Sequence, residues 1–288
     1  MKKIISLAFV FAAVTGMAQK ANNKLSFQKG QKFEVVTETT KNSSVELMGQ
    51  SMETKVNSTL TEVLDVQDAN NTGATVEHKV KRLKFDLTSP MQNQSFDSEK
   101  DAGSGDMGKL LEKSLKNKYT MTLDPSGKIT AIKSDDDNPN GKNPDAADMS
   151  DLISSQLGMS VGLPKSGEAS LFKILPDKEV SVGDSWTDSS SAQGQTRKTT
   201  YTVKSITASD IVLDYTEQLD INTKQQIMGM EATIITNDKS TVTITLDKTS
   251  GLLKQKTISM EEEGSMEAQG QKIPMKGKTN VTVTIRPA

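Results

Sequence analysis

Cysteine is absent from the 288-residue chain, and histidine and tryptophan occur once each. Without cysteine, the sequence excludes a disulfide scaffold, a thiol nucleophile and a zinc-thiolate site. It also excludes a lipid anchor of the bacterial lipoprotein type, because that modification is built on a cysteine. His78 is the single histidine, and no serine lies in a G-x-S-x-G segment, so no Ser-His-Asp hydrolase is predicted.

Aromatic residues and long apolar runs are also scarce. With 1 Trp, 3 Tyr and 7 Phe, the chain has too few aromatic residues for the two girdles of an outer-membrane barrel. The apolar stretch Ile4–Val14 is shorter than the roughly 20 residues that a membrane-spanning helix needs. We therefore expect no transmembrane segment in the mature chain.

The first eighteen residues have the layout of a secretory signal peptide. Lys2 and Lys3 precede the apolar stretch, and Gly16 and Ala18 form a small-residue exit. This predicts cleavage near Ala18 and a periplasmic or secreted protein. Without the leader, 33 basic residues face 37 acidic ones, a net charge of -4, so nucleic acid is not an expected partner.

Most of the chain has the alternating pattern of antiparallel β-strands. Apolar residues recur at every second position in 211–221, broken only by Glu217, and in 242–246 and 281–285, with threonine and valine enriched around them. In the segment 76–87 the alternation changes phase. Since a one-residue slip exchanges the two faces of a strand, we expect a β-bulge or sharp bend near Lys81 and Arg82.

Two segments have helical spacing instead. The first covers residues 106–117 with Asp106 as a cap, and the second covers 144–157, with Asn143 as cap and Gly158 as stop. A polar Asp- and Asn-rich run lies between them. The predicted organisation is a signal peptide at 1–18, a β-rich half at 19–133, a linker and helix at 134–165, and a second β-rich half at 166–288.

The two β-rich halves contain similar hairpins. YTMTLDPSGKITAIK at 119–133 matches VTITLDKTSGLLKQK at 242–256 in its T-x-T-L-D, its glycine and its closing lysines, Lys133 and Lys256. A second echo relates LMGQSME at 47–53 to IMGMEAT at 227–233. We interpret these as an internal duplication. The predicted fold is mainly β, with long antiparallel strands in a curved sheet or open half-barrel and two short helices on its concave face.

Candidate catalytic and metal-binding residues are few. On its strand face His78 lies with valines, which indicates a hydrogen-bonded histidine in a core or groove. Asp and Glu residues are abundant but fall in turns and on polar strand faces, so no catalytic pair stands out. The sequence thus predicts no enzyme, with no catalytic residues, no cofactor-binding residues and no cofactor.

One segment begins like a calcium-binding loop. Asp136, Asn138, Asn140 and Gly141 have the required alternation, but Ala147 replaces the glutamate at the twelfth position. A solvated linker is the better interpretation, and no metal site is predicted.

Methionine is frequent, with 14 residues. Its flexible, polarizable side chain can adapt to varied apolar ligands, or it can fill gaps in a curved core. Both interpretations apply to the methionines near the expected hairpins: Met48, Met52, Met228, Met230, Met260, Met266 and Met275.

The segment LPDKEVSVGDSW, Leu175–Trp186, resembles the hallmark of a family of exported bacterial proteins of unknown function. In physical terms Pro176 and Gly183 shape a turn, Asp184 bonds to backbone amides, and Trp186 is a large apolar plug. The overall pattern is also similar to open half-barrel carriers of lipid and lipoprotein in the bacterial envelope. That resemblance implies an apolar cavity between sheet and helices.

Three functions remain open from the sequence. The first is a non-enzymatic protein of the envelope that binds a hydrophobic ligand, such as a lipid, or a lipidated partner protein. The second is a structural or protein-interaction β module without a cavity. The third, a carboxylate-based hydrolase, requires two acids that converge in one cleft.

Overall fold

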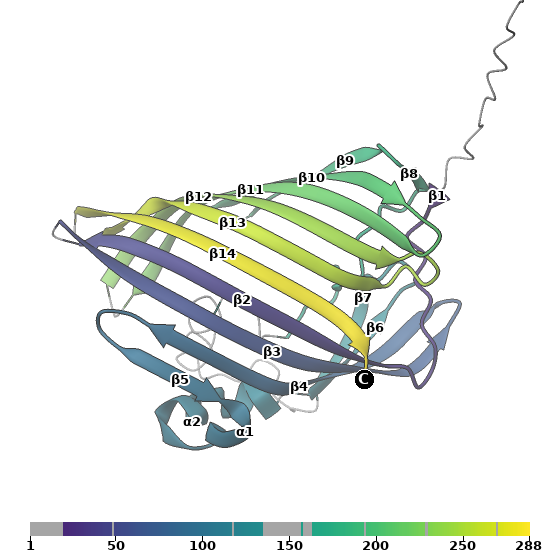
Figure 1. The fold of residues 1–288 in the computed structure, drawn as a ribbon, viewed down its shortest axis with the longest axis horizontal. Coiled ribbons are helices and arrows are strands. Elements are labelled where there is room, and N and C mark those ends of the chain that lie inside the picture. The colour runs from purple at the N-terminus through teal and green to yellow at the C-terminus, as the bar shows by residue number, and fades with distance from the viewer. Residues whose placement is uncertain are drawn as a thin grey trace, which may run out of the picture.

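One large antiparallel β-sheet forms the body of the protein, as the alternating pattern predicts (Figure 1). The computed structural model describes residues 20–47, 49–116, 118–134, 157, 163–192, 194–227, 230–268 and 270–288. Three predicted segments lie outside the described residues: the leader at 1–18, the calcium-loop-like run at 136–141, and residues 144–156 of the second helix.

Fourteen strands and two helices are described; the longest strand, β3, has 21 residues and the longer helix, α2, has 12. In chain order the elements are β1 (Lys20–Ala21), β2 (Lys32–Leu47), β3 (Gln50–Asn70), β4 (Gly73–Thr88), β5 (Asn93–Asp97), α1 (Ser98–Asp101), α2 (Gly105–Lys116), β6 (Lys118–Leu123), β7 (Ile129–Ser134), β8 (Val180–Ser181), β9 (Ser185–Ala192), β10 (Gln195–Ile206), β11 (Asp210–Ile227), β12 (Met230–Asp247), β13 (Leu253–Ala268) and β14 (Gln271–Pro287).

In the middle of the main sheet, the N-terminal strand β2 pairs with the C-terminal strand β14. The strand order is β7-β6-β4-β3-β2-β14-β13-β12-β11-β10-β9, β5 pairs with β4, and β1 forms a small separate sheet with β8. Because β2 pairs with β14, the N-terminal strands lie on one side of this junction and the C-terminal strands on the other. Among the described residues the sheet is open, with β7 and β9 as its edges.

The two faces of the sheet differ because side chains alternate along each strand. On β11, Ile211 and Leu213 are buried, whereas Thr216 and Gln218 on the opposite face are exposed. We call the face that carries Ile211 and Leu213 the inner face, and the other one the outer face. The sheet curls into an open trough (Figure 1).

The two ends of the trough also differ. At one end, which we call the closed end, the chain turns between β3 and β4, β6 and β7, β10 and β11, and β12 and β13. The segment 163–184 packs there, and its Phe172 and Leu175 share one cluster with Leu64 of β3 and Leu213 of β11. The open end carries the turns between β2 and β3, β11 and β12, and β13 and β14.

The predicted bulge lies in β4. Arg82 pairs with Thr61 and Val80 with Glu62, so Lys81 is the extra residue in the ladder. Because of this extra residue, the apolar residues before and after Lys81 lie on the same inner face. The bulge therefore explains the change of phase in the sequence.

The first predicted helix is confirmed as α2, which begins one residue before Asp106. Asp106 therefore lies in the first turn and is not the cap. Leu111 of α2 is buried against Leu83 and Phe85 of β4, on the inner face. A short helix that the sequence analysis missed, α1, is capped by Asp97. From the second predicted helix only Leu157 is described; it is helical and buried in the same cluster.

The two similar segments both form hairpins that turn at the closed end. In each turn an aspartate Oδ1 accepts a backbone N–H bond of 2.8 Å, from Ser126 to Asp124 and from Ser250 to Asp247. The backbone N–H groups of residues 25 and 26 donate to carbonyls of the two turns, at 3.0 and 2.8 Å. The N-terminal segment thus links the two hairpins.

Candidate functional site

The inner face of the C-terminal strands changes character along its length. Near the closed end it is apolar, as at Ile244 and Ile258. In the middle it carries acids, Asp238 and Glu262, and toward the open end methionine, as at Met266. We call these three parts the apolar zone, the polar band and the methionine zone.

Lys256 lies within the apolar zone. It stands on β13 between Ile244 of β12 and Val283 of β14. Its Nζ lies 5.5 Å from the centroid of the Tyr215 ring. A cavity of about 200 Å³ adjoins it, with walls that include Leu171, Ile174, Tyr201, Ile244, Leu253 and Val283. Burial lowers the pKa of Lys256, and the negative charge of Glu217 opposes that effect.

The charge of Lys256 has no ion-pair or hydrogen-bond partner among the described residues. The carboxylate of Glu217 lies 3.6 Å from Arg197 and accepts a 3.1 Å hydrogen bond from Thr199. The second lysine at the cavity, Lys173, forms an ion pair with Asp177. The cavity therefore has one uncompensated cation in apolar surroundings, an arrangement that costs free energy.

An aromatic row flanks the cavity. Trp186 stacks on Tyr201 with centroids 5.0 Å apart and an interplanar angle of 7°, and Tyr201 lies 4.9 Å from Tyr215. Trp186 is half-buried on the edge strand β9 and packs against the closed-end core. The predicted turn before it is confirmed, since Gly183 has a φ of 90° and Asp184 accepts a 2.8 Å bond from the N–H of residue 181.

The polar band contains a buried acid. Asp238 is 7% exposed, faces Glu262 across the β12–β13 ladder, and its Oδ1 has no hydrogen-bond partner. Burial and the charge of Glu262 raise the pKa of Asp238 to about 6. The buried hydroxyl of Thr39 on β2, which lies nearer the closed end beside Val281, also has no partner among the described residues. The polar band is thus incompletely hydrogen-bonded at Asp238.

The described methionines differ in burial, because Met121 is buried in the closed-end core whereas several of those near the hairpins are only half-buried. Met48 and Met228 lie outside the described residues, and the side chain of Met230 is not described. The others near the hairpins are half-buried and share the inner face: Met52, Met260, Met266 and Met275.

His78 is a hydrogen-bonded core residue, as predicted. It is 8% exposed, and its Nε2 lies 2.7 Å from Oε1 of Glu62. Its ring stacks on Tyr119 at 4.3 Å between centroids. This set is packed into the sheet on the N-terminal side of the junction and does not face the cavity at Lys256.

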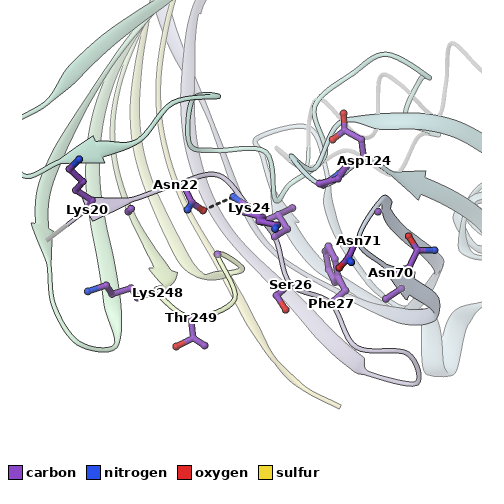
Figure 2. A pocket seen from close by; sticks show the side chains of 16 residues that line it. Lys20, Asn22, Lys24, Ser26, Phe27, Asn70, Asn71, Asp124, Lys248 and Thr249 are labelled. Carbon is purple, nitrogen blue, oxygen red and sulfur yellow. Dashed lines mark hydrogen bonds between the residues drawn. The ribbon is translucent and has the colours of Figure 1, made fainter.

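A larger hollow of about 640 Å³ lies at the closed end (Figure 2). The N-terminal segment and three hairpin turns surround it, and its lining is mostly polar, with Lys20, Asn22, Asn70 and Asp124 among the side chains that Figure 2 labels. Lys20 is paired with Glu179 at 3.1 Å. A polar hollow of this kind does not suit a hydrophobic ligand.

The described residues test the expected cavity between helices and sheet only at α2 and at the segment 170–174. The helix α2 packs directly on β4, and the apolar cavity lies between the sheet and residues 170–174. At about 200 Å³ it falls below the roughly 300 Å³ at which small-molecule sites usually begin, so it can enclose only part of a larger ligand.

The described residues contain no group of three or more His, Cys, Asp or Glu side chains that could hold a metal ion. None of the described helices is long and apolar enough to cross a bilayer.

Comparison with known proteins identifies the family. A model described as a family of unknown function (DUF6263) matches residues 71–253, more than half of the chain. The chain belongs to this family. The match begins in the turn between β3 and β4, so it leaves out β1, β2 and β3; it includes the segment 163–184 and β12, and ends where β13 begins. A search of curated proteins finds no match.

Solved structures show only distant likeness. A lipovitellin structure, titled for its lipid–protein interactions, has 11% identity and a TM-score of 0.48 over 91% of this chain. This chain spans about a quarter of the lipovitellin chain, at 26%. An outer membrane channel from Pseudomonas putida F1 has 8% identity and a TM-score of 0.25, covering 91% of this chain and 98% of its own.

The sequence analysis missed Lys256 as a site residue. The sequence does contain a signal. Lys256 shares a strand face with the apolar residues Ile258 and Met260, and a lysine is unusual on such a face. The hairpin repeat accounts for this lysine only as its closing residue.

Proposed function

We propose that the protein is an exported, non-enzymatic binding protein of the periplasm or extracellular space that holds a hydrophobic ligand, or the lipid part of a lipidated partner, against its inner face. One observation carries the proposal: the inner face leaves large apolar side chains half-buried. They are Tyr215, Ile258, Met260 and Val283 on the closed-end side of the polar band, and Met52, Met266 and Met275 toward the open end.

The physical argument is that a concave apolar surface is stabilised when it is covered. Removal of apolar area from water contributes about 25 cal/mol per Å². An acyl chain or sterol-like body supplies such a cover, and methionine can adjust to its shape. The outer face is different: its hollows are lined mainly by threonine, asparagine and charged residues, as around Thr241, Thr257 and Thr282.

Among the described residues, one pair of acids that the hydrolase alternative could use is Asp238 and Glu262, which face each other across the β12–β13 ladder. Asp238 is 7% exposed, so its carboxyl does not face an accessible cleft as a general acid must. The interaction-module alternative draws on the open edges β7 and β9. It predicts protein partners and no bound lipid.

Native mass spectrometry of the protein purified from its own cell envelope tests the proposal. We expect a bound lipid or other apolar molecule that solvent extraction releases. A protein that emerges without any such molecule, and that takes up no apolar probe afterwards, contradicts the proposal and favours the interaction module.

A variant pair sharpens this test. Met266→Gln with Met275→Gln keeps side-chain length but makes the methionine zone polar, so binding of the fluorescent probe N-phenyl-1-naphthylamine is expected to weaken about tenfold. The control is Met91→Gln, since Met91 is 84% exposed in the loop between β4 and β5. Equal binding by both variants would show that the methionine zone is not part of the site.

A further inference from the structure

The cavity beside Lys256 identifies the polar end of the ligand. We propose that this cavity is an anion site in which the Lys256 ammonium group binds the carboxylate of a ligand whose apolar body lies along the inner face. The inference rests on the proposed function and deepens it, because it names the ligand class as amphipathic monocarboxylic acids.

The first argument is the unmatched charge. Lys256 lies between Ile244 and Val283 with Tyr215 at 5.5 Å from its Nζ, and no acid contacts it among the described residues. A cation with few water contacts gains more from an anionic partner than an exposed lysine does. Arg197 and Thr199 already hold the carboxylate of Glu217.

The second argument concerns the charge and size of the ligand head. Asp177 neutralises Lys173, which leaves Lys256 as the single unpaired positive charge that the described residues contribute to the cavity. One lysine suits a carboxylate, whereas a phosphate dianion is usually held by several donors or by a bidentate arginine. The volume of about 200 Å³ encloses a carboxylate and a few carbons, and the half-buried Ile258 and Val281 continue the apolar path toward the open end.

The third argument comes from the related hairpin. The turn of the first hairpin closes from residue 124 to 128 and that of the second from 247 to 252, one residue longer. The ladders therefore place Ile132 opposite Met121, just as Lys256 is placed opposite Ile244. Since isoleucine serves the fold at the equivalent position, the lysine is not required for the hairpin.

The test compares two ligands that differ in the head alone, decanoate and 1-decanol, at pH 7.5. Trp186 is the single tryptophan and stacks on Tyr201 in the cavity wall, so its fluorescence reports binding. We expect decanoate to bind at least about tenfold more tightly than decanol. Lys256→Met should abolish this difference while decanol binding is retained. The control Lys239→Met, an exposed lysine of β12, should leave it intact.

A second measurement does not depend on a folded variant. Decanoate, but not decanol, should protect Lys256 from reductive methylation in the wild-type protein, as read by peptide mass spectrometry, with Lys239 modified equally in both cases. Equal affinity for the two ligands, or no protection of Lys256, overturns the carboxylate site and leaves the proposed function standing. If neither ligand binds and no lipid co-purifies, both proposals fail together.

Discussion

The two hairpins that turn at the closed end have the same framework and differ at one inner-face position. Both place a buried leucine before the turn, Leu123 and Leu246, and both use an aspartate to bind the turn's backbone amides. After the turn, the first hairpin carries Ile132 on the inner face and the second carries Lys256. The shared features stabilise the fold. The fold does not require a lysine at this inner-face position, and the proposed ligand site supplies a reason for it.

This comparison also corrects the sequence alignment. The match of Lys133 with Lys256 assumed turns of equal length, but the second turn is one residue longer. Lys133 is exposed on the outer face, whereas Lys256 lies on the inner face. A single inserted turn residue exchanged the two faces of the following strand.

The largest expected effect is the same in both hairpins. Leu123→Ala and Leu246→Ala each leave a cavity in the closed-end core, where the two leucines are 0% and 1% exposed. Each should lower the free energy of unfolding by about 3 to 4 kcal/mol, measured by denaturant titration. Met91→Ala, at an exposed site, is the control. A loss in one hairpin alone would break the comparison.

The glycines of the two turns should respond unequally. A Cβ on Gly127 would lie 2.8 Å from Leu25 and 3.0 Å from the backbone N of Lys173, whereas one on Gly251 meets its first neighbour, a backbone oxygen, at 3.0 Å. Both residues have positive φ. We expect a loss of about 2 to 3 kcal/mol for Gly127→Ala and about 1 to 2 kcal/mol for Gly251→Ala. Gly30→Ala has positive φ without close neighbours and measures the conformational cost alone.

Replacing Lys256 with isoleucine makes the second hairpin like the first. Because an uncompensated cation leaves the apolar zone, Lys256→Ile should stabilise the ligand-free protein by about 1 to 2 kcal/mol at pH 7. The pKa of Lys256 is lowered in the folded state, so its destabilising effect is full below that pKa and disappears as pH rises past the unfolded value of 10.5. Melting curves at pH 7 and pH 10.5 test this. A variant less stable than wild type would mean that the lysine has a structural partner.

The smallest expected effect on stability is in the polar band, in the part of β12 that has no counterpart in the shorter first hairpin. The pKa of Asp238 is raised to about 6 from 3.8, so ionisation of this group destabilises the fold above pH 6 and has no effect below pH 3.8. Asp238→Asn should therefore stabilise the protein by about 1 kcal/mol at pH 7.5, with the gain fading as pH falls toward 4. A gain that is independent of pH would assign the effect to hydrogen bonding instead of charge.

The duplication itself stays a prediction. The hairpin echo relates residues 123 positions apart, from 119 to 242, whereas the second echo relates residues 180 positions apart, from 47 to 227. A single tandem duplication produces one offset, so it accounts for only one of these echoes. Both echoes do fall on hairpins of the sheet, which explains their likeness through shared turn chemistry.

Much of the fold was accessible from the sequence because it depends on local periodicity. Alternation predicted β11, β12 and β14, the phase change predicted the bulge at Lys81, and helical spacing predicted α2. The helix α1 was missed because four residues give no periodic signal, and its cap, Asp97, is also the last residue of β5. The candidate site was not predicted, since its walls come from β10, β11, β12, β13, β14 and the segment 170–174.

By itself the sequence determined which residues form strands, where those strands turn and which face of each is apolar, because these properties follow from a two-residue period and from Asp and Gly in the turns. The tertiary structure alone decided that Lys256 faces inward beside an apolar cavity with its charge unpaired among the described residues. Strand order, register and turn length set that environment, and these depend on contacts between residues far apart in the chain.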